Sequence, residues 1–62
     1  MKGIVKFFNQ EKGFGFITGE DNNDYFVHIT DIKDNIELSD NLDVFFDVVE
    51  GDRGPKATNV TE

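Results

Sequence analysis

Short runs of aromatic and β-branched residues, separated by turn-forming residues, are the feature that most constrains the fold of this chain. Phe, Val and Ile supply 18 of the 23 hydrophobic residues, whereas Ala and Leu supply three. Pleated strands favour β-branched and aromatic side chains, and helices favour Ala and Leu. The composition therefore argues against an all-helical bundle and favours a small β-barrel or sandwich.

The turn-forming residues divide the chain into five expected strands. Breaks rich in Asn, Asp or Gly lie at 9–13, 21–24 and 50–55, and these residue types accept the backbone conformations that turns require. Five short strands separated in this way are typical of a closed or nearly closed antiparallel sheet. The expected strands cover residues 2–8, 14–19, 24–29, 42–49 and 56–60.

The segment between the third and fourth expected strands has a different pattern. Ile29, Ile32 and Ile36 recur at helical spacing, and Thr30 is placed to cap a short turn of helix. The polar residues that follow do not continue this spacing. We therefore expect a single helical turn and then a solvated loop within residues 30–41.

Alternation assigns side chains to the two faces of the sheet, because successive residues of a strand point to opposite sides. Phe14 and Phe16 share one face of their strand, and Phe26 and His28 share one face of the next. A barrel this small has one interior, which other residues can fill, so these four are expected on the outside. The expected interior residues are Val5, Ile17, Val27, Val44, Phe46, Val48 and Val60.

Two adjacent strands thus present three Phe rings and an imidazole to solvent, where rings reduce solubility unless they serve a purpose. Base stacking suits them, because every nucleobase has a π-face. Phe7 either joins this outer face or packs at its edge, Phe8 fills the margin of the barrel, and Phe45 alternates outward. Flanking candidates for contacts with phosphates and base edges are Lys6, Asn9, Gln10, Lys12, Asp24, Arg53 and Lys56.

The opposite assignment of faces stays open on the pattern alone. A slip of one residue exchanges the two faces of a strand, which would place the three Phe rings in the core and Ile17 and Val27 outside. In that case Gly13 and Gly15 serve only a hairpin turn, and His28 is an incidental surface or packed histidine.

The net charge of −7 argues at first against nucleic-acid binding through bulk electrostatics. The charges are unevenly distributed, however. Residues 1–19 carry +2 and residues 53–62 carry +1, whereas residues 20–52 hold eleven carboxylates against Lys33, or −10. We expect two basic ends to frame an aromatic and basic face, with stacking as the main source of affinity and a small salt dependence.

Small size and residue usage exclude several other classes. The chain has 62 residues, one His and no Cys, which leaves little scope for a catalytic or thiolate metal site. We expect one domain over residues 1–62, with no enzyme activity, no cofactor and no metal. No run is apolar enough to span a bilayer or to act as a signal peptide, so a cytoplasmic protein is expected, with a monomer as the default.

Two motifs and both ends of the chain resemble the bacterial cold-shock protein family. Residues 12–17, with the sequence KGFGFI, look like the family's first ribonucleoprotein motif, and residues 25–29, YFVHI, look like its second. Residues 3–9 and 50–60 are similar to the family's two ends. The resemblance covers nearly the whole chain in order, and the two motifs together are highly specific.

This resemblance implies a five-stranded oligonucleotide-binding (OB) barrel that binds single-stranded RNA and DNA with little sequence demand and a leaning toward pyrimidines. It also implies an RNA chaperone that melts weak structure in transcripts and so affects transcription or translation in the cold. Carried over to this sequence, the stacking residues are Phe7, Phe14, Phe16, Phe26 and His28, and the flanking polar contacts are Lys6, Asn9, Lys12, Asp24 and Arg53.

The chain departs from the family pattern at several positions. Phe7 stands where the family usually has Trp, and Ile29 where it often has Phe. Residues 30–41 contain no aromatic residue and look about two residues short of the family's loop, which usually carries another aromatic. Fewer stacked nucleotides and weaker affinity than in a typical member are therefore expected.

Two other classes of function remain as alternatives. A protein-interaction domain would use the aromatic face as a docking patch. An acidic nucleic-acid mimic would use the carboxylates of residues 20–52 to occupy a DNA-binding partner, and it would need them spread over its active face. Titration with oligo-dT and oligo-dA distinguishes both alternatives from a binder of single strands.

Overall fold

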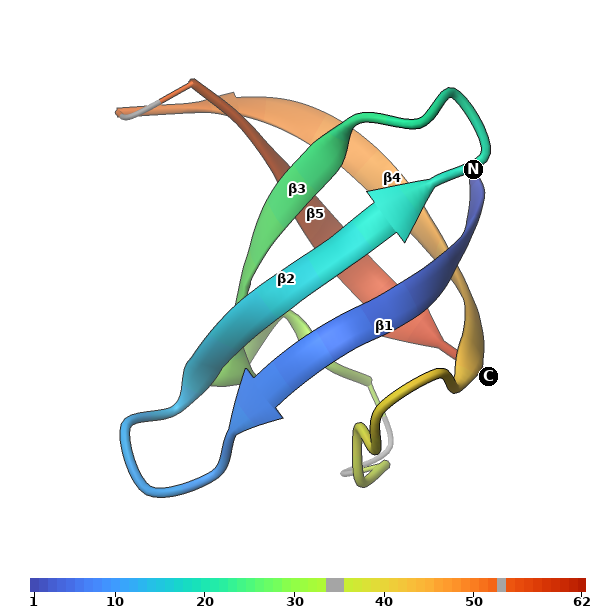
Figure 1. The fold of residues 1–62 in the computed structure, drawn as a ribbon. Helices are drawn as coiled ribbons and strands as arrows, with labels where there is room; N and C mark the ends of the chain where they lie inside the picture. The colour runs from blue at the N-terminus through green and yellow to red at the C-terminus, as the bar shows by residue number, and fades with distance from the viewer. Residues whose placement is uncertain (34–35, 53) are drawn as a thin grey trace.

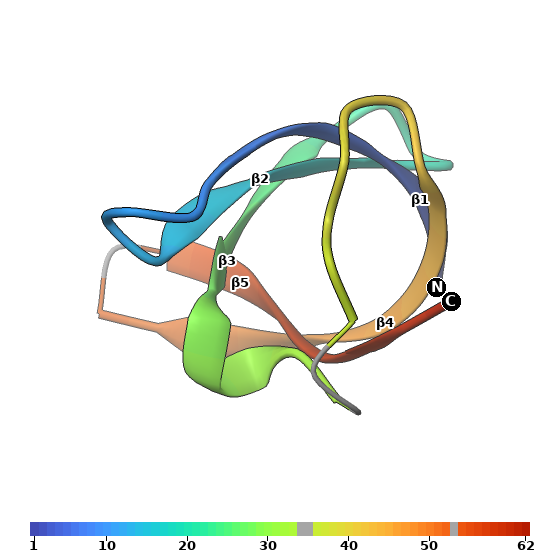
Figure 2. The same cartoon turned by 90° about the horizontal axis from the view of Figure 1, so that it is seen from below.

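Five strands close into a barrel in the computed structural model, which describes residues 1–33, 36–52 and 54–62 (Figure 1). Around the barrel their order is β1-β2-β3-β5-β4 (Figure 2). The all-β class and the closed five-stranded barrel that the sequence predicts are confirmed. The elements are β1 (Lys2–Asn9), β2 (Phe14–Gly19), β3 (Asp24–His28), the 3-10 helix η1 (Ile29–Asp31), β4 (Asp43–Gly51) and β5 (Gly54–Thr61).

One seam of the barrel differs from the antiparallel arrangement that the sequence predicts. Four strand pairs are antiparallel, whereas β3 and β5 run parallel and pair at Phe26 and Lys56. An isolated parallel bridge between Ile32 and Val60 lies beyond the end of β3. The reason is topological: strand directions cannot alternate all the way around a closed ring with an odd number of strands, so one pair must be parallel.

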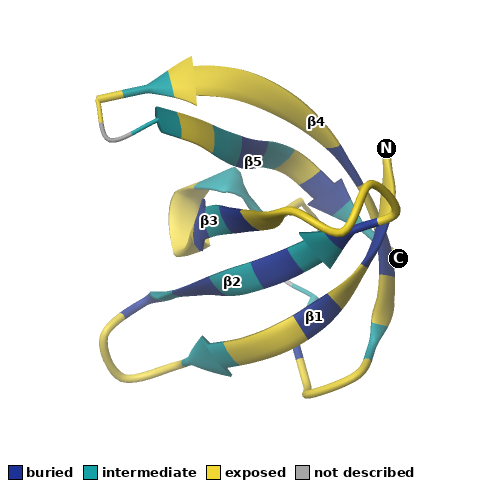
Figure 3. Cartoon of the chain, turned by 45° about the horizontal axis from the view of Figure 1, so that its top comes forward, coloured by how far each residue is buried: buried dark blue, intermediate teal, exposed yellow. Residues whose placement is uncertain are grey.

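Most of the expected interior residues form the core. Val5, Ile17, Val27, Val44 and Val60 are completely buried, and Phe46 is nearly so. Val48 was wrongly expected there, because it is 40% exposed. It lies on the second half of β4, which pairs with β5 alone after β1 has ended its pairing at Asp43–Phe45. This part of β4 extends past the core and is exposed to solvent (Figure 3).

Three further residues complete the core: Tyr25, Leu38 and Ala57. Tyr25 points inward with Val27, as alternation along the third expected strand indicates. Leu38 is a correction to the solvated loop expected after the helical turn, since it is only 3% exposed and packs into the open end of the barrel. Leu38 does not fall on the helical spacing of Ile29, Ile32 and Ile36, so that spacing gave no reason to expect its burial.

The predicted helical turn is present as η1, but its cap is not the expected residue. The side chain of His28 accepts a hydrogen bond from the backbone N–H of Thr30, so His28 rather than Thr30 is the N-cap. Of the expected strands, those at 14–19 and 24–29 agree with β2 and β3 to within a residue, while β5 begins two residues earlier than expected.

Candidate functional site

The pairing of β2 with β3 decides which faces of these strands point outward. Phe14 lies opposite His28 and Phe16 lies opposite Phe26, so the four residues project from one side of the two-stranded surface. Their neighbours Ile17 and Val27 have no exposed surface. The assignment with the Phe rings outside is therefore confirmed, and the opposite assignment is wrong.

Gly15 allows this surface to form, because it lies where β1 crosses closest to β2. A Cβ atom at this position would lie 2.2 Å from the carbonyl oxygen of Phe7 and 2.7 Å from Cα of Phe8. Backbone atoms cannot yield as a flexible side chain can, so any larger residue would push the two strands apart. Gly13 has a different role, since its φ of +74° is a turn conformation that favours glycine.

The rings form a continuous chain across three strands. Phe7 of β1 lies 5.7 Å from Phe16 between ring centroids, Phe16 lies 5.9 Å from Phe26, and Phe26 lies 5.9 Å from Phe14. Phe7 therefore joins the outer surface, while Phe8 packs against the core at the barrel margin. We call the set Phe7, Phe14, Phe16, Phe26 and His28 the aromatic face.

An open groove runs beside the aromatic face, with a volume of about 880 Å³. Phe14, Phe16 and Phe26 form one wall together with Asp24. The other wall belongs to the β4–β5 hairpin, and its described lining residues are Glu50, Gly51, Asp52, Gly54, Pro55 and Lys56. Among the described lining residues, three carboxylates thus face one ammonium, which the sequence did not predict.

Lys56 is the one cation among the described lining residues of the groove, and the family resemblance did not include it among the expected contacts. It lies beside Phe26 through the parallel pairing of β3 and β5. The sequence signal was only that Lys56 lies in a basic end of the chain. Its proximity to the rings depends on the parallel seam, which a pattern of alternating strands does not reveal.

Lys6 and Asp24, both expected to contact nucleic acid, contact each other. The ammonium of Lys6 lies 2.9 Å from Oδ2 of Asp24, and the hydroxyl of Thr18 donates to Oδ1 at 2.8 Å. The bond from Lys6, followed by the bond from Thr18, lowers the pKa of the Asp24 carboxyl below its usual 3.8. Both side chains remain exposed at the edge of the groove.

Asn9 and Lys12 lie in the β1–β2 hairpin, whose Gly13 carbonyl accepts a hydrogen bond from the backbone N–H of Ile29, the residue after His28. The side chain of Asn9 accepts a hydrogen bond from the backbone N–H of Lys12 at 3.0 Å and so stabilises the turn, while Lys12 is exposed. Nδ1 of His28 accepts a hydrogen bond from the backbone N–H of Thr30 and lies 3.0 Å from the Thr30 hydroxyl. Arg53, also predicted as a contact, lies outside the described residues.

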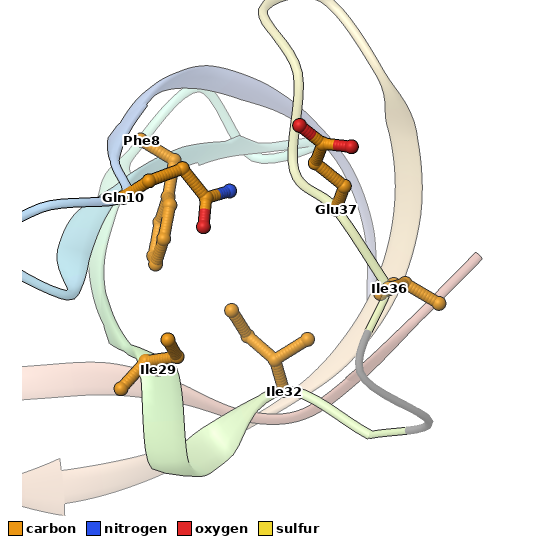
Figure 4. Close-up of a pocket in the computed structure, with 6 residues that line it drawn as sticks. All are labelled: Phe8, Gln10, Ile29, Ile32, Ile36 and Glu37. Carbon is orange, nitrogen blue, oxygen red and sulfur yellow. The ribbon is translucent and has the colours of Figure 1, made fainter.

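A second hollow, of about 310 Å³, lies at the end of the barrel beneath the loop that follows η1 (Figure 4). Phe8 and Ile32 point into it, and Gln10 and Glu37 lie at its rim. Its lining is otherwise apolar and includes Ile29 and Ile36. Among its described lining residues, Glu37 is the one carboxylate, and none of them also lines the groove beside the aromatic face.

Within the described ranges, no group of three or more His, Asp or Glu side chains is arranged to hold a metal ion. No helix in the part of the chain that the structure describes has the length and apolar character needed to cross a membrane.

Comparisons with known proteins agree with this geometry. The family model of the 'Cold-shock' DNA-binding domain matches residues 1–62. Cold shock protein 2 of Lactiplantibacillus plantarum is 55% identical over 60 residues, covering 94% of this chain and 91% of the relative. Cold shock protein CspA of Staphylococcus haemolyticus is 52% identical over 63 residues, covering 98% and 96%. Cold shock-like protein CspC of Bacillus cereus is 50% identical over 64 residues, covering 100% and 98%.

Proposed function

Because the chain belongs to the family of cold-shock DNA-binding domains, whose ligand is nucleic acid, we propose that it binds single-stranded RNA and DNA by stacking bases on the aromatic face. The observation that carries this proposal is the unbroken chain of rings from Phe7 to Phe14 along an open groove. Each ring lies within 6 Å of the next, a spacing at which bases of one strand can stack in succession.

Stacking supplies the affinity in this proposal. A base stacked on an aromatic side chain contributes about 1–3 kcal/mol by alanine substitution, and it does so for any base. The rings of Phe14, Phe16 and Phe26 are half-buried and Phe7 is exposed, so each offers ring surface to a ligand. Little sequence specificity follows, because stacking does not read the hydrogen-bonding edge of a base.

The proposed activity is that of an RNA chaperone, and it needs no covalent step. Bases of a weak hairpin exchange their own stacks for stacks on the aromatic face. A strand held there cannot pair again, so the equilibrium moves toward the open form without ATP. The ligand would be a cytoplasmic transcript, and no catalytic role is proposed for any residue.

Titration of a fluorescently labelled oligo-dT and oligo-dA with the protein, followed by anisotropy at two salt concentrations, tests the proposal. The double variant Phe14→Ala, Phe26→Ala should weaken binding by at least about tenfold, since it removes two stacking rings. Phe45→Ala is the matched control, because Phe45 is also an exposed ring but lies on β4 away from the groove.

Absence of binding to either oligonucleotide at low salt would refute the proposal. Unchanged affinity of a folded double variant would show instead that nucleic acid binds elsewhere on the barrel. A loss of affinity in Phe45→Ala equal to that in the double variant would also contradict a site on the aromatic face.

A further inference from the structure

Lys56 is a cation held in a fixed position inside the groove. Its backbone pairs with Phe26 in the parallel seam and with Val49 of β4. Its aliphatic stem passes close to Gly51, where a Cβ atom would lie 3.3 Å from Cδ of Lys56 and 3.4 Å from Cγ. The ammonium of Lys56 is thus presented beside the stacking rings, where the backbone of a bound strand would pass.

Asp31 of η1 holds the other end of this side chain. Its Oδ2 lies 3.4 Å from Nζ of Lys56, and its Oδ1 accepts a hydrogen bond from the hydroxyl of Thr58 at 3.2 Å. The Asp31 side chain is 17% exposed, whereas that of Lys56 is 37% exposed. The carboxylate is therefore mostly covered, while the ammonium that it neutralises is still accessible from the groove.

We infer that Asp31 is a positioning residue that masks the charge of Lys56 toward a bound strand, and so limits the electrostatic part of binding. This inference rests on the proposed function. A phosphate near Lys56 must share the ammonium with a carboxylate that the fold holds in place. Lys56 consequently neutralises little phosphate charge, so few counterions leave the strand when it binds next to this lysine.

Lys6 shows the same arrangement on the other side of the rings, since its ammonium is paired with Asp24. In both pairs the carboxylate comes from β3 or the helix that follows it. Two carboxylates from the acidic middle of the chain thus pair with Lys6 and Lys56, two of the lysines that flank the aromatic face. Only the Asp31–Lys56 pair has a mostly covered carboxylate, so it provides the clearer test.

The experiment measures the affinity for labelled oligo-dT between 50 and 200 mM NaCl. The proteins are the parent chain, Asp31→Asn, Lys56→Gln and the variant with both changes. Asparagine can still accept the hydrogen bond from Thr58. Asp43→Asn is the matched control, since it removes the same charge from β4 at a position paired with Ile4 and absent from the groove lining.

Asp31→Asn should bind about two- to fivefold more tightly at 50 mM, as expected for release of one partly exposed ion pair. It should also lose about 2.5-fold more affinity than the parent over this salt range, because one further phosphate contact steepens the salt slope by about 0.7. Lys56→Gln should abolish the gain in the Asp31→Asn background, because no ammonium is then left for the change at Asp31 to unmask.

A salt slope for Asp31→Asn equal to that of the parent or of Asp43→Asn would overturn the inference. The inference would also be overturned if the tighter binding of Asp31→Asn persisted when Lys56→Gln is added. Asp31 would then act through the overall electrostatic field of the protein and not through Lys56. Should Asp31→Asn fail to fold, Lys56→Gln alone decides: a loss beyond about threefold shows that Lys56 already binds a phosphate in the parent. Failure of the proposed function would differ, since the parent itself would not bind.

Discussion

Phe16 occupies an internal position in the chain of rings, and its replacement by leucine separates stacking from packing. Phe16 contacts Phe7 on one side and Phe26 on the other, with interplanar angles of 47° and 77°. Leucine keeps an apolar side chain of similar size between these neighbours but has no π-face. We therefore predict that Phe16→Leu weakens strand binding while the barrel remains folded.

The magnitude follows from the number of interactions lost. One base stack is worth about 1–3 kcal/mol, so the Kd for oligo-dT should rise about 5- to 150-fold. The free energy of unfolding should also fall, because Phe16 packs against both Phe7 and Phe26. Each of these two ring pairs is worth about 0.5–1.5 kcal/mol. Phe7→Leu removes only one ring pair and should cost the fold about half as much.

The assay needs a label on the oligonucleotide, since the chain has no Trp whose fluorescence a bound base could quench. Anisotropy of fluorescein-labelled oligo-dT gives Kd, and urea unfolding followed by circular dichroism gives the stability. Phe45→Leu is the control, because Phe45 is 54% exposed and has no ring partner among the described residues. If Phe16→Leu and Phe45→Leu change Kd equally, the rings are not a stacking surface.

Three further changes test the fold around the aromatic face. Gly15→Ala should lower the free energy of unfolding by more than the cost of ordinary overpacking, which is about 1–3 kcal/mol. The reason is that the new methyl group meets the backbone of Phe7 and Phe8. A variant as stable as the parent in urea would show that β1 and β2 can move apart without cost. The hydrogen bond from Tyr25, followed by the bond from the Asn23 backbone, lowers the pKa of Asp21 below 3.8. The ionised carboxylate of Asp21 therefore stabilises the fold above the unfolded pKa, and this stabilisation is lost as pH falls through the folded pKa. Thermal melts below pH 4 should show this loss, and Asp21→Asn should reduce it. The pKa of Tyr25 is raised above 10.0, chiefly by its hydrogen bond to Asp21, so stability should fall as pH rises through the folded value above 10; equal alkaline losses in Tyr25→Phe and the parent would contradict this.

Local alternation predicted which side chains of β2 and β3 share a face, and the argument that other residues fill the single interior favoured the rings outside. In both strands, branched residues with no other place to pack alternate with rings, so Ile17 and Val27 determine where Phe16 and Phe26 point. The same reasoning failed at Val48, since alternation does not report where a strand leaves the core. The burial of Leu38 was not predicted for a related reason, because it depends on the path of the loop after η1 and not on a periodic pattern.

The groove itself was beyond sequence reasoning, because it joins segments that are distant in the chain. Phe26 and Lys56 are neighbours only through the parallel seam, and Glu50 and Asp52 reach the rings only because the β4–β5 hairpin extends past the core. Segment charges correctly placed acid in the middle of the chain. They did not show that Asp24 and Asp31 are directed at lysines of the basic ends.

The parallel seam between β3 and β5 also links ligand binding to the integrity of the barrel. These strands share one ladder position, Phe26 with Lys56, and the isolated bridge between Ile32 and Val60, whereas β4 and β5 pair along most of their length. Opening of this seam would leave the β1–β2, β2–β3 and β4–β5 pairs intact. Partial unfolding should therefore begin between β3 and β5. A strand that stacks on Phe26 and continues over β5 would bridge the seam. A ligand that binds only the closed form raises the free energy needed to open it.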